Sequence, residues 1–171
     1  MVSVATKADV VARIEKLLVA LAEMDDGRDA ERDYLVASCP DRLEPTIRQM
    51  PTVAIHVLAA IGAGETNVVG LAARTGQLKG TVSKHVQRLV EAGLVHRGPV
   101  PGNRKEVRLT LTDDGALLDR VHQRMHTEKS DALREFLVRY SSADLQTLAK
   151  VLDDLLASGL PVWRPVSGTG R

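Results

Sequence analysis

A polar and basic segment between positions 79 and 88 carries side chains suited to reading and holding a nucleic acid. Gln87 and Arg88 are of the types that form paired hydrogen bonds with adenine and guanine. Lys79 and Lys84 offer charge to phosphates, a contact that positions a protein without reading sequence. The candidate DNA contacts in this segment are Lys79, Thr81, Ser83, Lys84, Gln87 and Arg88.

Two short helices must position these side chains. Apolar residues recur at spacings of three and four from position 79 to Ala92-Gly93, which predicts a helix with one buried face. A preceding helix is expected from a cap at Thr66 to Gly76, where glycine suits the left-handed end of a helix. The apolar positions assigned to these faces are Val69, Ala72, Val82, Val86 and Leu89. The pair is a helix-turn-helix whose second helix turns its polar side outward.

The pattern then changes to a period of two, which indicates a β-hairpin. Residues 94 to 97 form one expected strand, and Val107, Leu109 and Leu111 alternate with polar residues on the other. The intervening segment 98–103 is rich in glycine and proline and predicts a projecting turn. We expect Arg104 and Lys105, at its tip, to reach a minor groove or its phosphates. The whole arrangement is a winged helix-turn-helix.

The net charge of +1 conceals a basic block. Between Arg74 and Arg108 there are eight basic and two acidic residues, so this window is +6 and the remainder of the chain is −5. Phosphate neutralisation needs local rather than overall positive charge. The asymmetry favours a polyanion bound by one face.

The order and spacing of residues 66–115 resemble the MarR family of bacterial transcriptional regulators. The matching elements are Leu71-Ala72, Thr81-Val82-Ser83, Leu89, Gly93-Leu94-Val95-His96-Arg97, Asn103-Arg104-Lys105, and Leu109-Thr110 through Gly115. Two features depart from the family. Asn103 stands where the family has an aspartate beside the wing arginine, which predicts a less rigid tip, and residues 25–50 are longer than the family's usual linker.

The resemblance implies a homodimeric, sequence-specific DNA-binding regulator. It implies that N- and C-terminal helices of two chains interlock, and that a small molecule of unknown identity releases a repressor from a pseudo-palindromic operator. Apolar stripes support such seams outside the basic block, although they suit a monomer core equally. The stripes are Val10, Ile14, Leu17, Leu21 and Met24, and Leu145, Leu148, Leu152 and Leu155.

The fold class expected is mainly α with a small β-hairpin wing, in one compact domain. Its parts are an N-terminal helical dimerisation region (1–50), the DNA-binding lobe (51–112), C-terminal dimerisation helices (113–160) and a flexible tail (161–171). Further helices are expected through Tyr34, from a cap at Asp41, from Pro51 or Thr52, after Asp113, and after a capping box of Ser141 with Asp144.

Composition and motifs exclude several classes of protein. No apolar run among the 171 residues is long enough to span a bilayer, and one cysteine cannot form an internal disulfide, so we expect a cytoplasmic protein. Phosphate-binding loops, zinc-protease motifs and nucleophile triads are absent from the sequence, which predicts no enzyme and no cofactor. A winged adaptor that binds only proteins is the alternative, and weak salt dependence of binding would reveal it.

Three residues invite a regulatory role. Cys39 could sense oxidation, but a cysteine in a Ser-Cys-Pro turn is more often passive. His122 and His126, four apart on a helix, could share a metal if Glu44, Cys39 or Asp33 supplied further ligands. An exposed histidine pair is the commoner arrangement, so no metal site is assigned. His56 and His85 are expected at the surface or at caps, and Trp163 against the body of the protein.

Overall fold

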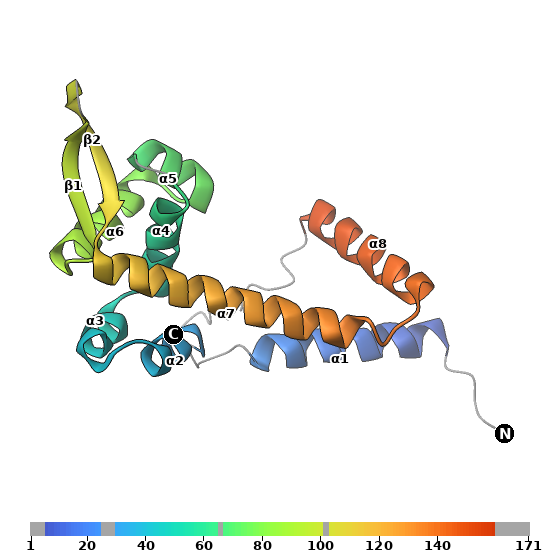
Figure 1. The fold of residues 1–171 in the computed structure, drawn as a ribbon. Coiled ribbons are helices and arrows are strands. Elements are labelled where there is room, and N and C mark those ends of the chain that lie inside the picture. Colours follow the sequence, from blue (N-terminus) through green and yellow to red (C-terminus); the bar gives the residue numbers. More distant parts are fainter. Residues whose placement is uncertain (1–5, 25–29, 65–66, 101–102, 160–171) are drawn as a thin grey trace, which may run out of the picture. The chain divides into compact units, whose positions relative to one another are not determined.

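The computed structural model describes residues 6–24, 30–64, 67–100 and 103–159. It is mainly helical with one antiparallel hairpin, as the sequence predicts (Figure 1). The expected tail and Trp163 lie outside the described residues. The elements are α1 (Lys7–Met24), α2 (Ala30–Ser38), the 3-10 helix η1 (Asp41–Leu43), α3 (Glu44–Gln49), α4 (Thr52–Gly62), α5 (Val68–Thr75), α6 (Lys79–Glu91), β1 (Val95–Val100), β2 (Asn103–Leu111), α7 (Asp113–Leu137) and α8 (Ser142–Ser158).

The chain divides into two units, which we describe separately. The central unit, Asp29–Asp131, holds α2 to β2 and most of α7. Its core is built around α4, which packs against α5, α6 and β2. Val57 and Leu58 of α4 are fully buried, and so are the three predicted core positions of α6, Val82, Val86 and Leu89. Burial of each such side chain contributes about 1.5 to 3 kcal/mol, so this packing fixes the outward face of α6.

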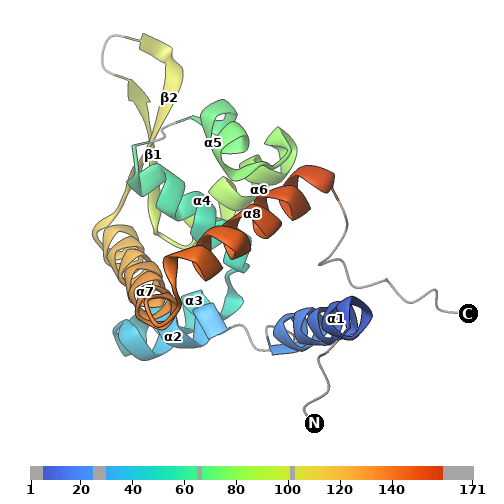
Figure 2. The same ribbon diagram turned by 90° about the vertical axis from the view of Figure 1, so that its right-hand side faces the viewer.

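The hairpin is longer than its sequence suggests. Its strands pair from Val95 with Leu111 to Val100 with Asn103, with an irregularity between Pro99 and Val100. The expected turn 98–103 is therefore wrong in extent, because pairing continues through most of it. A two-stranded sheet leaves one edge of each strand unpaired, and an edge strand tolerates a proline. The hairpin extends away from α4, α5 and α6, as a wing should (Figure 2).

Two helix caps differ from expectation. Thr66 lies outside the described residues, and the cap of α5 is Asn67, whose side chain accepts a hydrogen bond from the Gly70 amide at 2.9 Å. Val69 is exposed, whereas Leu71 and Ala72 face the core. Asp41 caps nothing, because it lies inside η1 and the N-cap position there is Pro40. Gly76 ends α5 in the left-handed conformation (φ +66°), as predicted.

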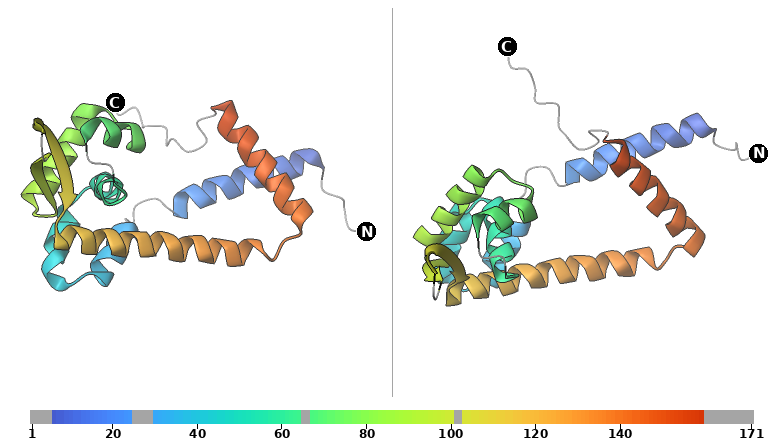
Figure 3. Two further views of the ribbon diagram at one scale, coloured as in Figure 1. Left: turned by 45° about the horizontal axis from the view of Figure 1, so that its top comes forward. Right: turned by 90° about the horizontal axis from the view of Figure 1, so that it is seen from above.

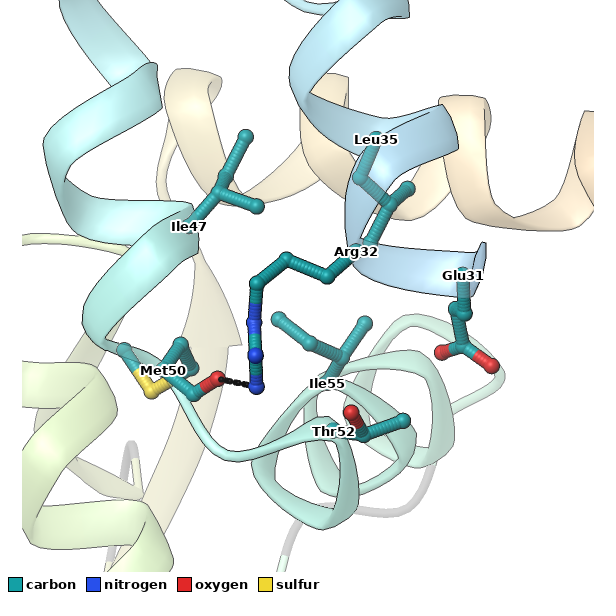
Figure 4. A pocket seen from close by; sticks show the side chains of 7 residues that line it. All are labelled: Glu31, Arg32, Leu35, Ile47, Met50, Thr52 and Ile55. Carbon is teal, nitrogen blue, oxygen red and sulfur yellow. Dashed lines mark hydrogen bonds between the residues drawn. The ribbon is translucent and has the colours of Figure 1, made fainter. Parts of the chain in front are cut away.

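Helices α2 and α3 lie beside the first half of α7 (Figure 3). The Tyr34 hydroxyl donates to Glu128 at 2.7 Å, and Arg42 forms an ion pair with Asp114. The Arg32 guanidinium donates to the Met50 carbonyl at 3.2 Å inside a small pocket, while the carboxylate of the neighbouring Glu31 turns away from it (Figure 4). The first two contacts join the segment that precedes α4 to α7, and the third lies within that segment.

The other unit comprises Met1–Arg28 and Ala132–Arg171, and contains α1, the end of α7 and α8. The predicted capping box is present, with the Asp144 amide donating to Ser141 Oγ at 3.2 Å. Both predicted apolar stripes lie on helices, but no residue of α8, which is described throughout, is buried. Among the helices of the described residues, none is both long and apolar enough to cross a membrane.

Candidate functional site

The outward face of α6 carries the predicted contacts. Lys79, Thr81, Ser83, Lys84, Gln87 and Arg88 are all exposed. A Cβ at Gly80 would meet nothing within 4 Å among the described residues, so the first turn of α6 is open to a close approach by a ligand. Free amides and the positive end of the helix dipole at this turn favour an anion such as a phosphate. The structure thus brings six of the eight predicted residues onto one surface.

Gln87 forms a hydrogen bond with a neighbouring side chain on this face. Its side-chain amide donates to Glu91 Oε1, one helical turn further on, at 2.9 Å. The hydrogen bond orients the Gln87 amide and leaves its carbonyl oxygen and one N–H for a base edge. Periodicity alone identifies neither this contact nor the role of Glu91 in holding Gln87.

The remaining two predicted residues lie on the wing. Arg104 and Lys105 are the second and third residues of β2. Two further arginines, Arg97 of β1 and Arg108 of β2, have exposed side chains. They belong to the basic block of the sequence, but the predicted contacts on the wing are limited to the tip of the hairpin and do not include them. The wing therefore offers more positive charge than its tip.

The base of the wing is fixed by Thr112, a role that the sequence pattern does not indicate. Thr112 Oγ1 donates to the Gly93 carbonyl at 2.8 Å and accepts from the Gly115 amide at 3.0 Å. Its own amide donates to the Leu94 carbonyl at 3.0 Å. The Leu-Thr-x-x-Gly pattern of the family is thus carried by Leu111, Thr112 and Gly115, rather than by Leu109 and Thr110.

A second constellation lies in the central unit, where three histidines meet one glutamate. His122 and His126 present their Nε2 atoms to each other at 3.1 Å. Glu31 Oε1 lies 3.1 Å from His122 Nε2 and 3.3 Å from His56 Nε2. One side-chain atom from each of the four residues lies within 4.8 Å of the other three. We call Glu31, His56, His122 and His126 the histidine cluster.

The cluster differs from the expected arrangement. His122 is 4% exposed, so of the pair on α7 only His126 is exposed to solvent. Glu31 and His56 join it from α2 and α4, whereas Glu44, Cys39 and Asp33 do not. The residue types are visible in the sequence, but no spacing connects positions 31, 56 and 122.

Burial shapes the ionisation of this region. It lowers the pKa of His122, against the raising effect of Glu31, and this favours the neutral imidazole. Burial also raises the pKa of Asp119, one turn earlier on α7, whose carboxylate accepts from Gln123 at 2.8 Å. Burial raises the pKa of the Cys39 thiol too, so the thiolate needed for oxidation sensing is disfavoured.

A hollow of about 450 Å³ adjoins the cluster and belongs wholly to the central unit. It is open to solvent and reaches the end of α5 and the turn before α6. Its lining residues are His56, Ala59, Ala60, Arg74, Thr75, Gln77, His122 and His126. A ligand in this hollow would touch both the cluster and the helix-turn-helix.

Comparison with known proteins agrees with this geometry. The family model described as "MarR family" matches residues 48–106. The chain is 30% identical over 121 residues to the HTH-type transcriptional regulator YhjH of Bacillus subtilis, covering 70% of this chain and 69% of that protein. The crystal structure of ZitR from Lactococcus lactis, a zinc-responsive MarR family member, is similar with a TM-score of 0.67 at 16% identity, covering 87% of this chain and 98% of that one. ZitR in complex with DNA is similar with a TM-score of 0.58 at 16% identity, covering 64% and 75% of the two chains.

The relatives and the fold are those of transcriptional regulators, which are not enzymes. The likeness to ZitR extends over nearly the whole of that chain, and the match to YhjH over more than two thirds of each sequence. On the sequence match, the family model and the winged helix-turn-helix together, this chain belongs to the MarR family of transcriptional regulators.

Proposed function

We propose that the protein binds a pseudo-palindromic operator as a homodimer and represses transcription in the cytoplasm. The single observation that carries DNA binding is the division of α6 into a buried apolar face and an exposed face of polar and basic side chains. The outward face has the residue types that read base edges in the major groove, and it continues into a basic wing. ZitR, which shares this fold, is described in complex with DNA.

The exposed apolar side chains of the other unit support the dimer. Helices α1 and α8 and the end of α7 leave a large set of apolar side chains in solvent, and such a set marks an interaction surface. A symmetric partner would cover them and would hold two recognition helices about one helical turn of DNA apart. The side chains are Val10, Val11, Ile14, Leu17, Val19, Leu21, Leu133, Phe136, Leu148, Val151, Leu152 and Leu156.

We further propose that an effector controls the affinity for DNA from the hollow beside the histidine cluster. This hollow touches α4 and α7, and it also touches Arg74, Thr75 and Gln77 at the end of α5 and in the turn that leads into α6. A ligand that binds there more tightly in one arrangement of these elements than in another would shift the DNA-binding equilibrium.

Selection of bound sequences from a pool of random duplex DNA tests the function. We expect a two-fold symmetric sequence with half-sites about one helical turn apart. The affinity for the selected duplex should fall with salt, with a log-log slope of about −0.9 for each phosphate neutralised. Failure to retain any duplex at low salt would overturn the proposal and would favour the adaptor alternative.

A further inference from the structure

We propose that the histidine cluster is a binding site for a divalent transition metal, zinc by preference, and that the bound metal is the effector that raises the affinity for DNA. The regulatory part of this proposal rests on the proposed function. The site itself does not, because it follows from the positions of four side chains. The first of these is Glu31, and the other three are His56, His122 and His126.

The spacing of the four ligand atoms fits a tetrahedral ion. Zinc bonds to imidazole nitrogen and carboxylate oxygen measure about 2.0 to 2.1 Å, so the ligand atoms of a tetrahedral site lie about 3.3 Å apart. Three of the separations here are 3.1 Å between the Nε2 atoms of His122 and His126, 3.1 Å from His122 Nε2 to Glu31 Oε1, and 3.3 Å from His56 Nε2 to Glu31 Oε1. Each is close to an edge of that tetrahedron.

Two buried polar atoms of the cluster have no hydrogen-bond partner among the described residues. Glu31 Oε1 is buried, and among the described residues it has no hydrogen-bond partner, although two imidazole nitrogens lie close to it. His122 Nδ1 likewise lacks a partner among those residues. A buried carboxylate oxygen without a partner is costly unless a cation lies beside it. A metal ion at the centre of the cluster would supply that positive charge.

The donor set selects among cations. Three imidazoles and one carboxylate suit zinc and its neighbours in the transition series, whereas calcium and magnesium require oxygen ligands. Four protein ligands also fill a tetrahedral shell, so no position remains open for a reacting water. Such a closed site is structural or regulatory in character, in agreement with a family of regulators.

The four ligands come from three helices, α2, α4 and α7, and a metal ion that links these helices can thereby affect DNA binding. Glu31 lies in the first turn of α2, His56 lies on α4 and the other two histidines lie on α7. Helix α4 carries the core against which α6 packs, and α7 begins at the base of the wing. A metal that ties these elements together restrains the DNA-binding unit before DNA arrives, so less conformational entropy is lost on binding.

Titration of the metal-free protein with zinc tests the site without DNA. We expect one zinc per chain, and a cobalt-substituted protein with the visible bands of a tetrahedral ion but without the near-ultraviolet band of a thiolate ligand. His56→Gln and His126→Gln should each weaken zinc binding by at least about 100-fold. Both side chains are exposed, so these variants keep the core intact. Magnesium should not compete.

Matched controls use residues outside the cluster. His96→Gln removes an exposed histidine of β1, and Cys39→Ser removes the cysteine considered as a ligand from sequence, so both should bind zinc as the wild type does. If His56→Gln and His126→Gln also retain full affinity, or if the wild type binds no zinc, the proposed site is wrong and the four side chains form only a hydrogen-bonded cluster.

The regulatory part is measured separately, on the duplex recovered by selection. Zinc should strengthen DNA binding by the wild type by about 5-fold to 150-fold, the usual range of coupling between two sites. His126→Gln should lose this response. A wild type that binds zinc but shows equal DNA affinity with and without it would overturn the regulatory role and leave the site standing. A protein that binds zinc but no DNA would instead refute the proposed function.

Discussion

Gly115, in the first turn of α7, lies so close to the carbonyl oxygen of Leu94 that no side chain fits between them. The same carbonyl accepts a hydrogen bond from the Thr112 amide, and Thr112 Oγ1 accepts from the Gly115 amide. The start of α7 is thereby locked to the beginning of the wing. A glycine is needed at position 115 because backbone, rather than a movable side chain, occupies the space next to it.

Gly115→Ala should destabilise the protein by about 1 to 3 kcal/mol, because the added methyl group collides with the Leu94 carbonyl and the packing must shift. The measurement is the free energy of unfolding in urea. Gly80→Ala is the matched control. Among the described residues nothing lies within 4 Å of a Cβ there, and alanine should gain up to about 1 kcal/mol from helix propensity. Equal stability of the two variants would refute the role of the close approach.

Lys84→Ala should weaken binding to every duplex alike. Its ammonium group is exposed on α6 and is assigned to a phosphate rather than to a base. The slope of log affinity against log salt should fall in magnitude by about one per protomer. The measurement is a salt titration of binding on the selected duplex and on a scrambled one. An unchanged slope would show that Lys84 does not contact a phosphate.

Arg88→Ala should instead relax the preference for one base pair in each half-site. Loss of a paired contact to guanine costs about 1 to 3 kcal/mol on the preferred base and little on the others. Repeating the selection with the variant and comparing the recovered sequences position by position measures this effect. A uniform loss across all sequences would identify Arg88 as a phosphate contact.

Asp119→Asn should alter the pH dependence of stability. Burial raises the pKa of Asp119 above its ordinary value of 3.8, so between the two values the folded state holds a proton that the unfolded chain releases. The wild type therefore loses stability as the pH rises through that window, and the loss persists above it. The amide variant carries no such charge, and its carbonyl can still accept from Gln123.

The difference in free energy of unfolding between Asp119→Asn and the wild type should therefore increase in favour of the variant as the pH rises from about 4. The increase should be about 1.4 kcal/mol for each pH unit between the pKa of Asp119 in the unfolded chain and its pKa in the folded protein. Urea unfolding of both proteins from pH 4 to pH 8 measures the difference. A difference that is independent of pH would show that the Asp119 carboxyl titrates alike in both states.

Leu152→Glu should dissociate the proposed dimer. Leu152 is 46% exposed on the apolar stripe of α8, and a carboxylate there would have to be buried against the partner. Loss of the leucine alone removes about 1.5 to 3 kcal/mol per copy, so the dissociation constant should rise at least tenfold in sedimentation equilibrium. Gln146→Glu adds the same charge on the opposite side of α8 and should leave the dimer intact. A monomeric wild type would overturn the assignment.

Elements with local signatures were predictable from the sequence alone. The apolar periods of α4 and α6, the left-handed Gly76, the capping box at Ser141 and the alternation in β2 all depend on neighbours within one helical turn or one strand. They suffice to identify a winged helix-turn-helix and the outward face of α6. Where local patterns compete, as between Thr66 and Asn67 for the cap of α5, the sequence alone does not choose.

The tertiary structure decided what depends on contacts between distant parts of the chain. Glu31, His56 and His122 are separated by 25 and 66 positions, and only the packing of α2, α4 and α7 brings their ligand atoms together. Thr112 secures the wing through a carbonyl 19 residues earlier. Periodicity shows that one face of a helix is apolar, but what covers that face depends on the rest of the fold. Periodicity therefore predicted the apolar stripe of α8. Only the structure showed that the side chains of this stripe are not buried within the chain.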